Sequence, residues 1–217
     1  MARITRKDIL NTPDEFITTT SSVLVWIKEH PQQFIIGAVA LVCILAGGYG
    51  VYYWKTNREL DGMNAYMKAS NNSQMSLQVA QEYSDTKAGK LAKLRLARMS
   101  FEQGNQKMAL AYADEFINRW VGKDTFHWQA ILITASAYMQ QNEPAKALPM
   151  LDTCIENASK DLKDQALFLK ANALIAMGKG NEARQCLSSV SENYSEMAKT
   201  LLASLGSSPS AKLNAKQ

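Results

Sequence analysis

The chain has 217 residues and a formal net charge of +4 at pH 7, from 24 Lys and Arg against 20 Asp and Glu. This balance is too mild for a nucleic-acid-binding protein, which needs a strongly basic face. The two histidines have no Cys, Asp or Glu set at ligand spacing, so no metal site is expected. Phosphate-binding glycine loops and nucleophile motifs are absent from the sequence, which therefore predicts no enzyme, no cofactor and no small-molecule substrate.

Residues 1–33 form an N-terminal head. Residues 12–15 (TPDE) are typical of a helix start, with a capping hydroxyl, a proline at the first position and acids in the first turn. The apolar residues that follow share roughly one face, which favours an amphipathic helix on a membrane surface or a partner; a frayed tail is the alternative. His30 is expected to end this segment because it precedes a proline.

Residues 34–54 are apolar and uncharged. As a helix rising ~1.5 Å per residue, the stretch matches the ~30 Å hydrocarbon core of a bilayer. A cleaved signal peptide would have a shorter head and a shorter run, and a lipid anchor on Cys43 would need a small residue where Val42 stands. The aromatic residues up to Trp54 suit the membrane–water interface. The stretch therefore predicts a single uncleaved transmembrane helix that contacts lipid.

Charge near this span says little about its orientation. Lys28 is the nearby cation on the head side, while Lys55, Arg58 and Lys68 follow the span. Counted over the whole head, the positive-inside rule weakly favours a cytoplasmic N-terminus.

Residues 55–205 are rich in Ala, Leu, Met, Lys, Glu and Gln, which predicts an all-α domain. Helices are expected from Asn57 to Ser70 and from Gln74 to Tyr83 as an atypical leading pair, and from Glu196 to Leu205 as the closing helix. Residues 206–217 are small and polar, which predicts a disordered tail. The predicted turns are residues 71–73, 84–86, 104–105, 122–124, 142–144, 159–161, 178–180 and 191–193.

Three of these turns repeat in step, because Gly104, Asn142 and Gly178 are 38 and 36 residues apart. An alanine stands seven residues before each turn and another stands five residues after it. Small residues let two helices cross closely, and Gly or Asn tolerates the positive φ of a tight turn. This pattern predicts an α-hairpin solenoid of the tetratricopeptide repeat (TPR) type. The repeated alanines are Ala97, Ala135 and Ala171 before the turns, and Ala109, Ala147 and Ala183 after them.

The first helices of stacked TPR units line a concave groove, which suits a peptide or helix of a protein partner. Alignment on the repeated alanines predicts two apolar rows with a polar row between them; the alternative is that several of these residues are core. The three rows are Leu94, Leu132 and Phe168, then Arg98, Ser136 and Asn172, then Phe101, Met139 and Ile175.

Two further groups of residues leave alternatives open. Cys154 and Cys186 are expected on second helices of their repeats, either as small buried residues or as a disulfide in an oxidising compartment. Five cations between Lys87 and Arg98 favour a solvated helix face over a surface for nucleic acid, anionic lipid or an acidic partner.

The sequence also carries the phrase Glu82-Tyr83-Ser84-Asp85-Thr86, followed by Leu91-Ala92-Lys93-Leu94-Arg95-Leu96-Ala97. With the head, span and TPR-like body, this phrase resembles the YfgM-type proteins, whose pattern is E-Y-P-x-T and then A-x-L-R-L-A. Ser84 departs from the usual proline. The resemblance implies an ancillary subunit of the bacterial SecYEG translocon in the inner membrane, with a cytoplasmic head and a periplasmic body.

The expected function is therefore a membrane-anchored scaffold that binds Sec translocon subunits and links secreted chains to periplasmic chaperones. A TPR scaffold for assembly of the outer membrane or cell wall is the alternative. The partners expected are proteins and, through the span, membrane lipid.

Overall fold

The computed structural model describes residues 25–191 and 195–206. The chain divides into two units, Met1–Asn57 and Arg58–Gln217. The expected helix start at residues 12–15 and all but the first residue of the expected tail lie outside the described residues. In the described ranges the regular elements are helices without strands, which confirms the all-α class.

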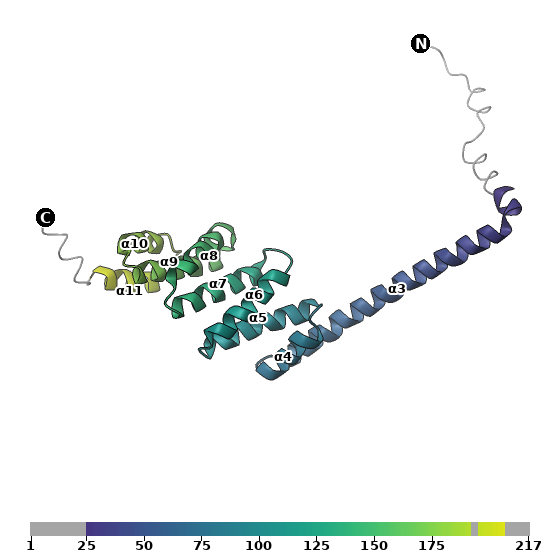
Figure 1. The fold of residues 1–217 in the computed structure, drawn as a ribbon. Helices are drawn as coiled ribbons and strands as arrows, with labels where there is room; N and C mark the ends of the chain where they lie inside the picture. The colour runs from purple at the N-terminus through teal and green to yellow at the C-terminus, as the bar shows by residue number, and fades with distance from the viewer. Residues whose placement is uncertain (1–24, 192–194, 207–217) are drawn as a thin grey trace, which may run out of the picture. The chain divides into compact units, whose positions relative to one another are not determined.

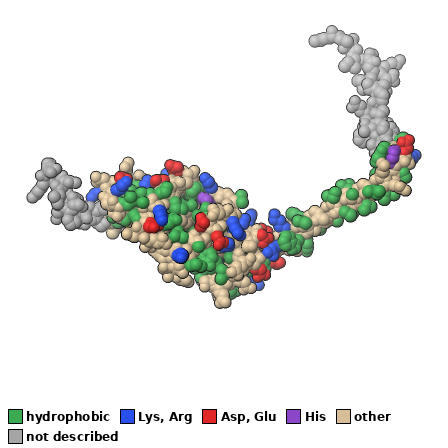
Figure 2. Space-filling view, viewed as in Figure 1, with side chains coloured by type: hydrophobic (Ala, Val, Ile, Leu, Met, Phe, Trp, Pro, Cys, Tyr) green, Lys and Arg blue, Asp and Glu red, His purple; other side chains and the backbone are tan. Residues whose placement is uncertain are grey.

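Helix α3 (Pro31–Lys68) begins directly after His30, where the sequence predicted a break. Its apolar part is long and hydrophobic enough to cross a membrane, and none of that part is buried in the protein. Figure 2 shows green side chains without charged ones along the middle of this helix. Exposed apolar surface of this extent is unfavourable in water, so α3 is a candidate membrane span.

The helix expected from Asn57 to Ser70 is not a separate element, because α3 continues through it to Lys68. Residues 55–68 contain no proline, and their one glycine, Gly62, lies inside the helix against the Tyr83 ring. The helical backbone therefore continues without interruption past Trp54, where the sequence predicted the membrane–water boundary.

The second unit combines the last part of α3 with eight helices among the described residues (Figure 1). Each helix from α4 packs on the next one along the chain, and α7 also contacts α5 and α9. This order of contacts is that of an α-hairpin solenoid. The helices are α4 (Ser73–Glu82), α5 (Lys87–Glu102), α6 (Gln106–Arg119), α7 (Thr125–Gln140), α8 (Pro144–Asn157), α9 (Lys160–Ala176), α10 (Gly180–Ser188) and α11 (Ser195–Gly206).

The three repeated turns share one backbone geometry. Gly104, Asn142 and Gly178 have φ values of +76°, +62° and +76°, the left-handed region that favours Gly and Asn. After each of them, a backbone N–H donates to a carbonyl five residues earlier, as in the Schellman motif. These bonds run from Asn105 to Ser100 (2.8 Å), from Glu143 to Tyr138 (2.9 Å) and from Lys179 to Leu174 (2.8 Å).

The six repeated alanines are all fully buried, at 0% exposure. Large side chains fill the space between the helix crossings that these alanines form. Trp128, Leu132 and Leu151 pack together between α7 and α8, while Phe116 packs with Leu94 between α5 and α6. The predicted hairpin solenoid is therefore confirmed.

Candidate partner-binding surface

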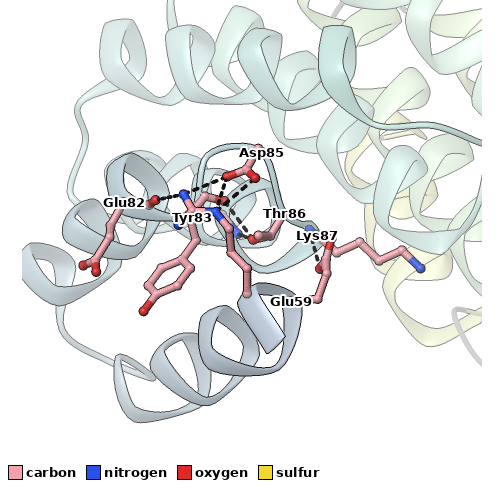
Figure 3. Close-up of polar contacts among 8 residues, drawn as sticks. Glu59, Glu82, Tyr83, Asp85, Thr86 and Lys87 are labelled. Atoms are coloured by element: carbon pink, nitrogen blue, oxygen red, sulfur yellow. Dashed lines mark hydrogen bonds and ion pairs between the residues drawn. The ribbon is translucent and has the colours of Figure 1, made fainter. Parts of the chain in front are cut away.

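The turn between α4 and α5 is bound to the last part of α3 by Arg58. Figure 3 labels Glu82, Tyr83 and Asp85 of this turn. The Arg58 Nε donates to both carboxylate oxygens of Asp85 at 3.1 Å, and Nη2 donates to the carbonyl of Glu82 at 2.6 Å. The guanidinium also lies 5.5 Å from the centre of the Tyr83 ring. The bond to Asp85 is the main reason that the pKa of Arg58 is raised, so its charge is matched within the fold.

The start of α5 completes this junction. The Thr86 hydroxyl caps the helix by accepting from the Gly89 N–H at 3.2 Å, and it donates to the Tyr83 carbonyl at 2.8 Å. Glu59 accepts from the Lys87 N–H at 3.1 Å, which places a carboxylate at the positive end of α5 (Figure 3). We call Arg58, Glu59, Tyr83, Asp85 and Thr86 the junction cluster.

Two glycines permit this close packing. A Cβ on Gly89 would lie 2.0 Å from the Tyr83 carbonyl oxygen, and a Cβ on Gly62 would lie 3.0 Å from the Tyr83 ring. Residues 82–86, which carry the sequence resemblance, therefore have a structural role in joining α3 to the repeats.

A pocket of about 150 Å³ opens between the last part of α3, α5 and α7. It has a partly apolar floor and two arginines, and we call it the arginine pocket. Its lining residues are Tyr66, Leu91, Leu94, Arg95, Arg98, Phe126 and Gln129.

Neutral groups hold the two arginines in place, so no carboxylate of the described residues balances their positive charge. Arg95 places its guanidinium carbon 3.7 Å from the centre of the Tyr66 ring and donates to the Tyr66 carbonyl at 2.8 Å. The exposed Arg98 donates to the amide oxygen of Gln129 at 3.1 Å. Both acceptors are neutral oxygens, and neither arginine pairs with a carboxylate within the described part of the chain.

Several cations elsewhere in the repeat domain pair with carboxylates. Lys93, five residues before Arg98 on α5, pairs with Glu115 of α6. Its pKa is nevertheless lowered, first by burial and then by Arg119. Lys170 pairs with Asp152 at 2.6 Å, and the hydrogen bond raises the pKa of Lys170. Of the five cations between Lys87 and Arg98, Lys93 therefore has its charge matched within the fold.

The nine residues of the predicted groove lie in different environments. Leu94 and Leu132 are core residues, 5% and 6% exposed, which is the alternative that the sequence left open. Of the nine, the arginine pocket brings together Leu94 and Arg98. Half-buried residues make up the rest: Phe101, Ser136, Met139, Phe168, Asn172 and Ile175.

Stagger between neighbouring hairpins explains why the predicted rows are not continuous. Arg98 corresponds to Ser136 in the repeat, yet it bonds to Gln129, seven residues earlier. Facing positions on α5 and α7 are therefore about two helical turns out of register. Tyr66, Phe126 and Gln129 could not be predicted from the repeat alignment for this reason. Arg95 carried a signal in the sequence, as one of the five clustered cations.

Two further recesses lie on the repeat domain. One of about 490 Å³ is walled by Leu110 and Ile117 of α6, Ile131 of α7 and Met150 of α8. The other, of about 410 Å³, is walled by Phe168 of α9 with Met197 and Leu201 of α11. Both are mainly apolar, and neither is lined by a cation.

The cysteines of the repeat domain are free thiols. Burial raises the pKa of the Cys154 thiol to about 11 and also raises that of Cys186. Burial therefore favours the protonated, less reactive form of both thiols. In the ranges that the structure describes, no three His, Cys, Asp or Glu side chains come together to hold a metal.

Residues 165–196 match the family model of the tetratricopeptide repeat. No curated protein and no solved structure matches the chain. The match covers most of α9 and all of α10, which form the third repeat of the predicted series. The chain therefore contains a tetratricopeptide repeat, a scaffold for protein–protein interaction without catalytic chemistry of its own.

Proposed function

We propose that the protein is a single-pass membrane scaffold whose repeat domain binds protein partners. The observation that carries this proposal is a helix whose apolar, uncharged part is long enough to span a bilayer, followed in the same chain by tetratricopeptide hairpins. Such hairpins present their first helices to partners. The arginine pocket lies on two of these helices, α5 and α7.

The finer proposal rests on the resemblance to the YfgM-type proteins. The head lies in the cytoplasm, α3 crosses the bacterial inner membrane, and the repeat domain lies in the periplasm beside the Sec translocon. There it passes emerging chains to periplasmic chaperones. Four Lys and Arg residues in the head and a long folded body make this orientation compatible with the positive-inside rule.

Protease treatment of intact spheroplasts and crosslinking from the repeat domain test this proposal. A photo-crosslinking residue at Ser136 or Asn172, on the first helices of two hairpins, is expected to capture Sec subunits in native membranes. The same residue at Lys107, exposed on α6, is the control. Protection of the domain in spheroplasts contradicts the orientation. Capture of cell-wall or outer-membrane factors in place of Sec subunits supports the envelope-assembly scaffold.

A further inference from the structure

The arginine pocket brings two cations together without a carboxylate from the described part of the chain. Six cations elsewhere in the described part of the domain form ion pairs within the fold: Arg58, Lys93, Lys146, Lys170, Lys179 and Lys199. Arg95 and Arg98 line one pocket and donate to neutral oxygens. A guanidinium prefers a carboxylate or phosphate, to which its N–H groups bind in pairs. The described part of the chain supplies no anion to this pocket. The two positive charges are therefore available to a carboxylate or phosphate of a bound partner.

The size of the pocket limits its occupant. Small-molecule sites usually enclose about 300–1,000 Å³, whereas this pocket encloses about 150 Å³. This volume suits one side chain of a partner rather than a whole metabolite.

Apolar surface beside the arginines adds a second requirement. Phe126 is 40% exposed at the rim, and Leu91 and Leu94 form the floor. A hydrated anion would leave this apolar surface uncovered. A segment with an anionic group next to an apolar side chain would bind the arginines and cover the apolar surface at the same time.

We propose that the arginine pocket binds an acidic side chain of an extended protein segment whose neighbouring apolar side chain packs on Phe126. The inference rests on the proposed function, because it names the chemistry of the partner that the repeat domain binds. Arg98 makes the ion pair with the carboxylate. Arg95, fixed on the Tyr66 ring, holds a second positive charge beside it. The pocket thereby selects acidic–apolar segments over neutral ones.

Peptide binding to the full chain in phosphatidylcholine nanodiscs tests this selection. The probes are fluorescein-labelled Ser-Leu-Glu-Leu-Glu-Leu-Ser and the same peptide with both Glu residues replaced by Gln, measured by anisotropy at low salt. The Glu peptide is expected to bind about tenfold more tightly than the Gln peptide. This ratio should fall as salt screens the ion pair.

Matched variants locate the effect. Arg98→Gln keeps a hydrogen-bonding group beside Gln129 but removes the charge, and it is expected to abolish the preference for the Glu peptide. Lys87→Gln removes the same charge from the same helix outside the pocket, and its side chain points away from the junction cluster in Figure 3. This control is expected to keep the preference, and an unchanged Tm for both variants shows that the fold is retained.

Several outcomes would overturn the inference. They are equal binding of the two peptides, no saturable binding of the Glu peptide, or an undiminished preference in Arg98→Gln. Displacement of the Glu peptide by glycerol 3-phosphate at an equal concentration would assign the pocket to a phosphate headgroup instead.

Failure of this inference is distinguishable from failure of the proposed function. Sec crosslinks from Ser136 together with equal binding of the two peptides would refute the acidic segment alone. Selective, Arg98-dependent peptide binding without Sec crosslinks would refute the translocon assignment alone.

Discussion

Two arginine–tyrosine pairs in the repeat domain have opposite surroundings. At the junction cluster, Arg58 lies over Tyr83 and is paired with Asp85. In the arginine pocket, Arg95 lies over Tyr66 and donates to a backbone carbonyl. The first pair uses its charge to join α3 to the α4–α5 turn. The second keeps its charge available at a surface, so arginines with similar aromatic contacts serve stability in one place and recognition in the other.

The largest expected effect comes from Gly89→Ala at the junction. The new Cβ would meet the Tyr83 carbonyl oxygen at 2.0 Å, and because this atom belongs to the backbone, the turn itself must move. We expect the free energy of unfolding to fall by roughly 1–3 kcal/mol, seen as a lower Tm by circular dichroism in detergent.

Gly180→Ala is the matched control for this variant. Gly180 is also helical, and a Cβ there would meet nothing within 4 Å. We expect its Tm to stay the same or rise slightly, since alanine favours helix over glycine. If the two variants lose equal stability, the close packing at Gly89 has no special importance.

A smaller effect is expected when the two arginines are compared directly. Arg58→Gln removes the ion pair with Asp85 and should lower the Tm by less than Gly89→Ala does. Arg98→Gln should leave the Tm unchanged, because its side chain is exposed and contacts one neutral amide. A larger Tm loss in Arg98→Gln than in Arg58→Gln would reverse the roles assigned to the two sites.

The smallest effect concerns the reactivity of the thiols. Cys154 is fully buried, and with a pKa of about 11 only about one thiol in a thousand is ionised at pH 8. Cys186 is half-buried, so iodoacetamide should modify it before Cys154 at pH 8. Because the folded pKa is raised, the thiolate fraction of Cys154 increases as the pH rises towards 11.

The rate at which Cys154 is modified also distinguishes the packing around the junction cluster from the arginine pocket. Modification of Cys154, followed by mass spectrometry, should accelerate in Gly89→Ala if loss of the junction loosens the repeats, and stay slow in Arg98→Gln. Equal acceleration in both variants would contradict the assignment of Arg98 to the surface.

Local features of the fold were predictable from the sequence. Gly104, Asn142 and Gly178 adopt positive φ as expected, because turn geometry depends on the residue at the turn. The buried alanines were predictable for a related reason, since a helix crossing excludes large side chains whatever the neighbouring sequence. The closing helix was expected from Glu196 to Leu205 and is observed as α11, one residue longer at each end.

Features that depend on packing between helices were not predictable in the same way. The continuation of α3 to Lys68 depends on the absence of any residue that ends a helix, rather than on a positive signal. The arginine pocket depends on the stagger between α5 and α7, which brings Arg98 to Gln129 instead of Ser136. Repeat spacing gives equivalent positions along the chain, but not which of them face one another.

The three Schellman turns have one more consequence, for how the domain changes in length. Each turn is closed by hydrogen bonds within its own hairpin, from Asn105 to Ser100 and at the equivalent positions. The geometry of each turn therefore depends on residues of the same hairpin. A whole hairpin of 36 to 38 residues is therefore the natural increment of duplication or deletion, while the loss of a few residues inside a helix would put the alanines out of step.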